Sequence, residues 1–334
     1  MGRRRDRNKK GKLSQLWVLC TFMLLLSVVF SLLAHLNWVF DLFSHFVIQY
    51  IIVSAALAIL LLLFKRKGWA LVAVLIMGSQ VYKVKPYFGI NEVTDSPYDE
   101  VKILQYNVNR NNKNVEQMAR WIVSKSEDID IVVLLEVNER WQESIRRIKW
   151  AYPYHISKDM RGGRNMVVFS RLYVDEIEIK QFGENKSPAI VIRGETTGYE
   201  QDFVLYGAHP PPPILPSYAK ANGVILDSIA RHIAKEKIDH KMLVADFNRT
   251  RFSPHFKDMI DKSELNDSNE GFGFEALQPS WPSFLPNLMG ITIDNVLVSD
   301  NIIVDNRELG PAMGSDHYPV ITTLKLVVPD ENNS

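Results

Sequence analysis

Hydrophobic residues occur in long uninterrupted runs in the first 85 residues and in short runs in the rest of the chain. Residues 17–36 contain no Lys, Arg, Asp or Glu, and residues 46–64 form a second apolar run. A helix rises about 1.5 Å per residue, so about 20 apolar residues span the hydrocarbon core of a bilayer. Residues 69–82 form a third, shorter run. The pattern predicts an α-helical membrane anchor of about three transmembrane helices in residues 1–85.

The basic residues predict the orientation of this anchor. Seven of the first twelve residues are Lys or Arg, and residues 65–67 are Lys-Arg-Lys, whereas residues 37–45 contain neither. Because cytoplasmic segments are enriched in Lys and Arg, we expect a cytoplasmic N-terminus in the cell (inner) membrane. Three crossings put the rest of the chain in the periplasm or outside the cell. If residues 69–82 only lie in the interface, the rest is cytoplasmic. A retained anchor fits better than a cleaved signal peptide, because two further apolar runs follow the first.

The remaining residues show the pattern of a layered α/β domain. Residues 86–100 are polar and predict a linker, residues 101–328 a catalytic domain, and residues 329–334 a tail. Apolar spacing predicts amphipathic helices at residues 115–123 and 217–237. Short apolar runs predict strands at residues 101–106, 129–135, 166–169, 189–192, 203–206, 242–245, 293–298 and 320–326. Buried strands that alternate with helices indicate one α/β domain.

The formal net charge of +1 conceals two unlike halves. Residues 1–85 hold 12 Lys or Arg and 2 Asp or Glu, so residues 86–334 hold 27 and 36, a net charge of −9. An acidic domain does not attract nucleic-acid backbones at long range, so phosphate affinity would have to come from a local groove or bound metal ions. The single cysteine, Cys20, lies in the first apolar run. A disulfide scaffold and thiolate catalysis in the domain are therefore excluded.

Polar residues cluster at the ends of the predicted strands: most directly follow a strand, Asp316 and His317 precede the last one, and Asp294 lies near the start of the strand before it. Carboxylates suited to Mg²⁺ or Mn²⁺, amides and imidazoles are supplied by five separate segments, a distribution typical of a ligand site at the strand ends of an α/β sheet. These residues are Asn107, Asn109, Glu136, His209, Asp246, Asn248, Asp294, Asp316 and His317. The sequence contains no G-x-S-x-G, P-loop or H-E-x-x-H motif, so the usual serine hydrolase, NTPase and zincin classes are not indicated.

Six segments in this order resemble the motif series of the endonuclease/exonuclease/phosphatase superfamily, which includes deoxyribonuclease-I-like nucleases, sphingomyelinases and inositol-polyphosphate phosphatases. They are LQYNVN, VVLLEV, YGAHPPPP, LVADFN, TIDNVLVS and GSDHYPV, and they cover about residues 100–328. The layout resembles bacterial membrane-anchored members. The resemblance implies a two-sheet β-sandwich flanked by helices (four layers), preceded here by the membrane anchor.

The resemblance also implies roles for individual residues. Metal ligands would be Glu136, Asn107, Asp316 and Asp246, for Mg²⁺ or Mn²⁺. Reaction groups would be His317, Asp246, Asp294 and His209, with Asp294 orienting the ring of His317. Groups that bind the phosphate would be Asn248, Asn107 and Arg164. The chain departs from the family pattern at Asn109, where many members carry Asp, and at Ala245 and Asn295. The departure at Asn109 weakens its assignment as a ligand, whereas those at Ala245 and Asn295 remove no reaction group.

These features predict a membrane-anchored, metal-dependent phosphodiester hydrolase, nuclease-like, in which water attacks in line. The substrate is a nucleic acid or a phospholipid, and no protein partner is predicted. One alternative is a phospholipid or sphingomyelin phosphodiesterase or a phosphatase of the same fold. A second alternative is a non-catalytic binding member, which the full set of polar residues disfavours. The sequence leaves the substrate open.

Overall fold

The computed structural model of the chain describes residues 2–89, 94–158, 165–184 and 186–329. They divide into two compact units, one of residues 1–86 with 251–254 and one of residues 87–250 with 255–334. Each unit has its own core of buried apolar side chains.

The first unit is helical. It contains the helices α1 (Gly2–Leu32), α2 (Trp38–Leu42), η1 (Phe43–Phe46), α3 (Val47–Leu63) and α4 (Lys67–Lys83), and the sequence boundary between the units falls within the turn η2 (Lys85–Phe88). Within the described residues, two segments are long and apolar enough to cross a membrane, Gly11–Leu32 and Trp38–Leu63. Residues 37–45 were expected as a loop between two spans, but residues 38–45 are helical instead and lead into α3. The third apolar run forms α4, which has 17 residues.

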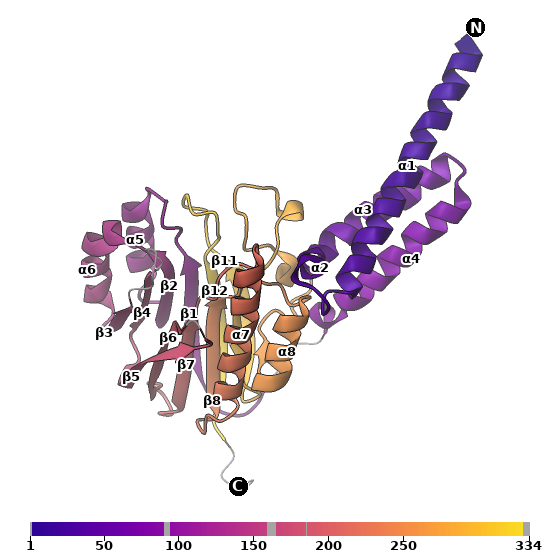
Figure 1. The fold of residues 1–334 in the computed structure, drawn as a ribbon. Helices are drawn as coiled ribbons and strands as arrows, with labels where there is room; N and C mark the ends of the chain where they lie inside the picture. The colour runs from indigo at the N-terminus through magenta and orange to yellow at the C-terminus, as the bar shows by residue number, and fades with distance from the viewer. Residues whose placement is uncertain (1, 90–93, 159–164, 185, 330–334) are drawn as a thin grey trace. The chain divides into compact units, whose positions relative to one another are not determined.

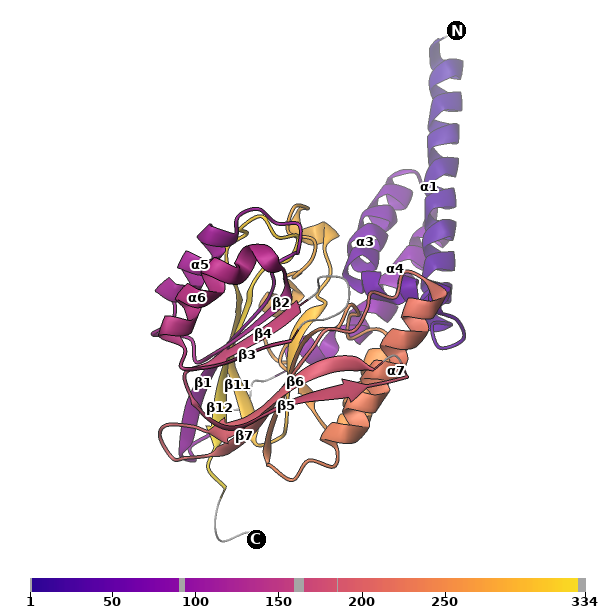
Figure 2. The same ribbon diagram turned by 60° about the vertical axis from the view of Figure 1, so that its left-hand side comes forward.

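The second unit is a sandwich of two six-stranded sheets. The first sheet has the order β11-β12-β1-β2-β4-β3 and the second has the order β5-β6-β7-β8-β10-β9. The first comprises β1 (Tyr98–Asn107), β2 (Ile131–Val137), β3 (Tyr154–Lys158), β4 (Asn165–Ser170), β11 (Ile302–Leu309) and β12 (Val320–Val327). The second comprises β5 (Tyr173–Phe182), β6 (Ser187–Glu195), β7 (Asp202–Ala208), β8 (His240–Asp246), β9 (Asn266–Asp267) and β10 (Asp294–Val298). The two sheets face each other in Figures 1 and 2.

Helices cover the outer face of each sheet. These are α5 (Val115–Ser124) and α6 (Gln142–Ala151) on the first sheet and α7 (Pro216–Ile233) and α8 (Pro254–Ser263) on the second, with the short turns η3 (Glu139–Trp141), η4 (Glu275–Leu277) and η5 (Asn287–Met289). Figure 2 shows α5 and α6 against one sheet and α7 against the other. The predicted four-layer α/β sandwich with apolar helices before it is therefore confirmed.

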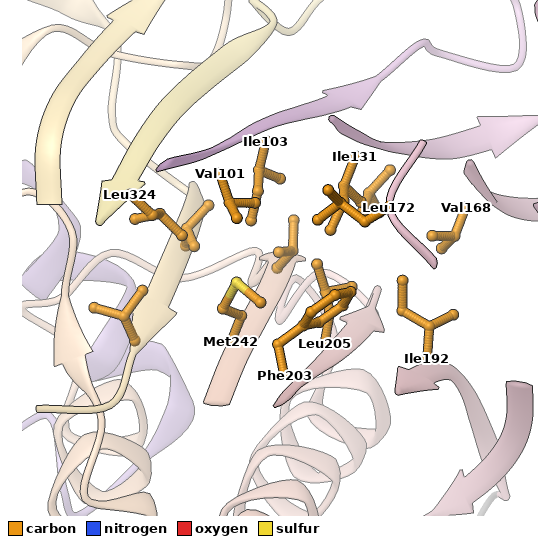
Figure 3. Close-up of a cluster of buried hydrophobic side chains, with 14 of the residues drawn as sticks. Val101, Ile103, Ile131, Val168, Leu172, Ile192, Phe203, Leu205, Met242 and Leu324 are labelled. Atoms are coloured by element: carbon orange, nitrogen blue, oxygen red, sulfur yellow. The ribbon is translucent and has the colours of Figure 1, made fainter. Parts of the chain in front are cut away.

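The interior between the sheets is formed by alternate residues of each strand. Val101 and Ile103 of β1 meet Phe203 and Leu205 of β7 there, and Figure 3 shows these side chains between the two layers. Leu104, the residue after Ile103, points to the other face and packs beneath α5 and α6. Because successive side chains of a strand point to opposite faces, β1 contributes residues to two hydrophobic cores.

All eight predicted strands and both predicted helices are present, but the pattern missed several elements. Strands β3, β5, β9 and β11 and helices α6 and α8 were not predicted. β5 alternates charged and apolar residues at the edge of its sheet, so it lacks the continuous apolar run of a central strand. Edge strands with one solvated face give a weaker sequence signal.

Candidate functional site

The strand ends that carry polar residues lie at one edge of the sandwich. β1 and β2 are parallel, with Asn107 beside Leu135, so Asn107 and Glu136 are neighbours at the ends of these strands. In the second sheet β7 and β8 are parallel, and β10 runs antiparallel to β8 with Asp294 opposite Asp246. The first residue of β10 therefore meets the last residue of β8 at the same edge.

Asp246 lies at the centre of the site and is almost fully buried. Its Oδ2 accepts a hydrogen bond of 3.0 Å from Asn107 Nδ2 and lies 3.5 Å from His209 Nε2 and 3.8 Å from His317 Nε2. Burial alone raises the pKa of Asp246, but the hydrogen bond with His209 and the charge of His317 outweigh it and lower the pKa. Asp246 is therefore a carboxylate at neutral pH, held among three nitrogen-bearing side chains.

His317 and Asp294 form a buried ion pair beside Asp246. His317 Nδ1 lies 2.8 Å from Asp294 Oδ2. Burial lowers the pKa of His317, but the charge of Asp294 and this hydrogen bond outweigh burial and raise the pKa to about 9. His317 is therefore an imidazolium at neutral pH, and its Nε2–H is directed towards the Asp246 side of the site.

Asn248 lies in a tight turn that directly follows β8. Its backbone N–H donates to Asp246 Oδ1 over 2.9 Å, and its Nδ2 donates to the carbonyl of Pro210 over 3.0 Å. Its φ of 53° is in the left-handed region, which Asn tolerates better than most residues. The hydrogen bond from Asn248 to Pro210 thus connects the D-x-N segment to the Pro-rich segment that follows His209.

Glu136 is half-buried and has a left-handed backbone, with φ of 59°. Its Oε2 accepts a hydrogen bond of 3.3 Å from the backbone N–H of Arg110. A non-glycine residue with positive φ is uncommon and often marks a functional site, because the surrounding structure must stabilise the strain. The conformation turns Glu136 out of the ladder that β2 forms with β4, where the register shifts between Leu134 and Val137.

Asn109 and Asp316 are joined across the site. Asn109 Nδ2 donates to Asp316 Oδ1 over 2.7 Å, and Trp281 Nε1 donates to Asp316 Oδ2 over 3.1 Å. Both carboxylate oxygens of Asp316 are thus engaged by neutral donors. Arg164, expected to bind the phosphate, lies outside the described residues.

Several residues at the site escaped prediction from the sequence. Gln105 Nε2 donates to Asp294 Oδ1 over 2.7 Å. The hydroxyl of Ser280 accepts the backbone N–H groups of Ile293 and Asp294. The hydroxyl of Ser315 donates to the carbonyl of Asn107 over 2.6 Å and accepts the backbone N–H of His317. The one available signal was the polar Gln105 inside the apolar run VKILQY, since buried polar groups need partners.

The side-chain oxygen atoms at this edge suit a hard divalent cation. Glu136, Asn107 and Asp246 supply carboxylate and amide oxygens, the ligands that Mg²⁺ and Mn²⁺ prefer. Ligand atoms of Asp246, Asp294 and His317 also lie within 4.8 Å of one another, and all three residues are buried. Both oxygens of Asp294 bind His317 and Gln105, and both oxygens of Asp246 accept hydrogen bonds from Asn248 and Asn107. Glu136 and Asn107, neighbours at the ends of β2 and β1, add further oxygens at the same edge.

The fold and this edge define the class of protein: a two-sheet sandwich with a carboxylate, amide and imidazole site at one edge. The chain belongs to the endonuclease/exonuclease/phosphatase family, whose sequence profile matches residues 104–317. Members of this family are generally hydrolytic phosphoesterases that depend on a divalent metal. No curated protein sequence matches the chain significantly.

Solved structures share the fold at low sequence identity. An endonuclease/exonuclease/phosphatase family protein from Bacteroides thetaiotaomicron is 18% identical with a TM-score of 0.56, over 70% of this chain and 100% of that one. TDP2 from D. rerio, complexed with a single-stranded DNA product, is 15% identical with a TM-score of 0.55, over 68% and 99%. SmcL is 17% identical with a TM-score of 0.51, over 67% and 97%.

Proposed function

We propose that the chain is a metal-dependent phosphodiester hydrolase of the nuclease-like kind, held at the cell membrane by its N-terminal helices. The observation that carries the proposal is the surroundings of Asp246. One carboxylate oxygen lies within 3.8 Å of both histidine Nε2 atoms and accepts the amide of Asn107. Such a carboxylate can hold or deprotonate a water molecule while the imidazolium of His317 donates to a phosphate oxygen.

A divalent cation bound by Glu136, Asn107 and Asp246, with Asp316 as a further carboxylate, would polarise the phosphoryl group and stabilise the leaving oxygen. The protein side chains would position the reacting groups and donate hydrogen bonds. Asp294 holds the ring of His317, and Asn248 and His209 supply donors on the other side of Asp246. Arg164 is proposed as a further phosphate ligand. Each of these roles is a proposal that substitution can test.

The experiment is a substrate panel with the full-length protein in detergent micelles. Duplex DNA, single-stranded DNA, RNA, sphingomyelin and bis(4-nitrophenyl) phosphate are incubated with Mg²⁺ or Mn²⁺, with and without EDTA. We expect hydrolysis that EDTA abolishes, with a nucleic acid as the favoured substrate, as the bound DNA product of the structural neighbour TDP2 suggests. Hydrolysis that persists in EDTA contradicts the proposed chemistry.

A lipid phosphodiester is the second candidate substrate, and one observation favours it. Two segments next to the site, residues 210–219, which end in the first turn of α7, and residues 276–293, contain no charged residue. Five of their large apolar side chains are exposed: Ile214 by 62%, Leu215 by 50%, Phe284 by 74%, Leu288 by 63% and Met289 by 58%. Exposed apolar clusters mark interaction surfaces, and nucleic-acid binding instead requires Lys and Arg.

The double variant Phe284→Ser, Leu288→Ser distinguishes the two substrates. If the substrate is a lipid, its hydrolysis in mixed micelles falls while hydrolysis of the soluble diester is unchanged. Trp150→Ser is the matched control, because Trp150 is 93% exposed on α6, away from these segments in the sequence. If the double variant and the Trp150→Ser control hydrolyse lipid at equal rates, the lipid proposal is contradicted and only the nuclease proposal remains.

We also propose the domain division of the sequence analysis, with residues 1–85 as anchor and residues 101–328 as catalytic domain outside the cytoplasm. This orientation requires α4 to cross as well. Its 17 residues correspond to about 25 Å of helix, near the lower limit for a span. In a Cys20→Ala background, Lys235→Cys reports the side of the membrane. We expect a membrane-impermeant maleimide to label it from outside in sealed right-side-out vesicles, and labelling only after lysis contradicts the orientation.

A further inference from the structure

Gln105 is a fully buried amide in a position where the strand otherwise points apolar side chains inward. Val101 and Ile103, at the two preceding inward positions of β1, belong to the core between the sheets. Gln105 is 0% exposed. Burying an amide in such a core costs free energy unless the amide forms hydrogen bonds, so the bonds of Gln105 need an explanation.

The amide of Gln105 binds the carboxylate that holds His317. Gln105 Nε2 donates to Asp294 Oδ1 over 2.7 Å, and His317 Nδ1 binds the other oxygen, Oδ2, over 2.8 Å. The opposite amide orientation would put Gln105 Oε1, an acceptor, against a carboxylate oxygen, so the donor orientation follows from the chemistry. β1 belongs to the first sheet and β10 to the second, and the bond therefore links the two sheets behind His317.

A buried cation lies in the same interior. Arg307 of β11 is 2% exposed and stands opposite Thr322 of β12, and β12 also pairs with β1. Burial lowers the pKa of Arg307, and the charges of Asp267 and Asp294 oppose this effect. Among the described residues, Arg307 Nε and Nη2, Gln105 Oε1 and Thr322 Oγ1 have no hydrogen-bond partner. Gln105, Thr322 and Arg307 thus form a polar interior layer, a set of buried polar side chains behind Asp294.

We propose that Gln105 is a positioning residue, which fixes the carboxylate of Asp294 and through it the imidazole of His317. The proposal rests on the proposed function, because the position of His317 affects rate only if the chain hydrolyses phosphoesters. With both oxygens held, the carboxylate of Asp294 cannot rotate away from the imidazole. His317 Nε2 is then presented to the reacting phosphate in one orientation, and that geometry contributes to turnover rather than to substrate binding.

The test measures EDTA-sensitive hydrolysis of bis(4-nitrophenyl) phosphate by the full-length protein. Gln105→Met keeps the length of the side chain and removes the donor, and we expect kcat to fall about 10- to 100-fold with KM within about twofold. Gln105→Glu has the same shape but sets a carboxylate against Asp294, so we expect a larger fall. Thr322→Val, in the same interior layer, is the packing control and should retain the wild-type kcat.

A double-substitution cycle separates positioning from a general effect on packing. If Gln105 acts through Asp294, Gln105→Met has no further effect on kcat in an Asp294→Asn background. An equal fall in both backgrounds, or a kcat of Gln105→Met within twofold of wild type, overturns the inference while the proposed function stands. A wild-type protein that hydrolyses no phosphodiester in an EDTA-sensitive manner overturns both.

Discussion

Asn109 Nδ2 donates a 2.7 Å hydrogen bond to Asp316 Oδ1 across the candidate site. The family resemblance puts an Asp at this position in many members, and two carboxylates at this distance repel each other unless a cation or a proton lies between them. The amide removes one negative charge from the site and replaces repulsion with a hydrogen bond. The asparagine at position 109 therefore has a structural reason: its amide holds Asp316 through a hydrogen bond that needs no cation.

Asn109→Asp should make the protein more dependent on divalent metal. In EDTA we expect a loss of about 1 kcal/mol, or about 2–4 °C in Tm, because Asp316 loses a donor and gains a like charge. Added Mg²⁺ should restore Tm and half-saturate activity at a lower concentration than in wild type. Asn111→Asp adds the same charge at an exposed position and is the control. Equal Tm values for both variants in EDTA contradict the explanation.

Substitutions at the proposed reaction groups should reduce activity without unfolding the protein. We expect His317→Ala to lower kcat by about 10²–10⁴-fold, because a positioned proton donor contributes that much to a reaction. Glu136→Gln should instead raise the Mg²⁺ concentration needed for half-maximal activity, since an amide is a weaker cation ligand. His255→Ala is the control, because His255 is exposed and matches no motif. A wild-type kcat for His317→Ala contradicts its role as a reaction group, and an unchanged Mg²⁺ requirement for Glu136→Gln contradicts its role as a ligand.

Acid stability should depend on Glu236. Its carboxylate accepts hydrogen bonds from Arg193 and Tyr206, which outweigh burial and lower its pKa to about 2. A lowered pKa in the folded protein contributes stability above the unfolded value of about 4.5, and this contribution disappears as pH falls towards 2. Glu236→Gln should cost about 1–2 kcal/mol at pH 7, or about 2–8 °C in Tm.

The matched control for Glu236 is Glu184→Gln, since the side chain of Glu184 is 78% exposed and lies 3.9 Å from Lys220. Thermal melts of the wild type and both variants between pH 7 and pH 2 give the comparison. The difference between wild type and Glu236→Gln should shrink as the solution is acidified. A constant difference over this range would show that the ionised form of Glu236 does not contribute.

Phe203→Ala should destabilise the sandwich strongly. Phe203 is 0% exposed between the two sheets (Figure 3), so its removal leaves a cavity that packed strands cannot fill. We expect a loss of about 3–5 kcal/mol in the free energy of unfolding, measured by denaturant titration of the full-length protein. Phe284→Ala removes the same atoms from a side chain that is 74% exposed and should change stability by less than about 0.5 kcal/mol. A similar small effect for Phe203→Ala contradicts the assigned core.

The sequence predicted the central strands because buried strands carry continuous apolar runs. It also predicted that Asn107 and Asp246 lie at strand ends, since each directly follows such a run, and it placed Asp294 near the start of another run. It did not predict β5 or β11, whose exposed faces interrupt the apolar pattern. The number of sheets came only from the family resemblance, because apolar spacing records which residues are buried and not which strands pair.

What the sequence determined by itself is local: the apolar segments of the first 85 residues, the positions of the central strands along the chain and the chemistry at their ends. The tertiary structure decided which of these groups meet. Gln105 and Asp294 are 189 positions apart and lie in opposite sheets, yet they share a 2.7 Å hydrogen bond. No local pattern encodes such a pair, because its geometry depends on how two sheets stack. The support of His317 by Asp294, and of Asp294 by Gln105, arises from that stacking.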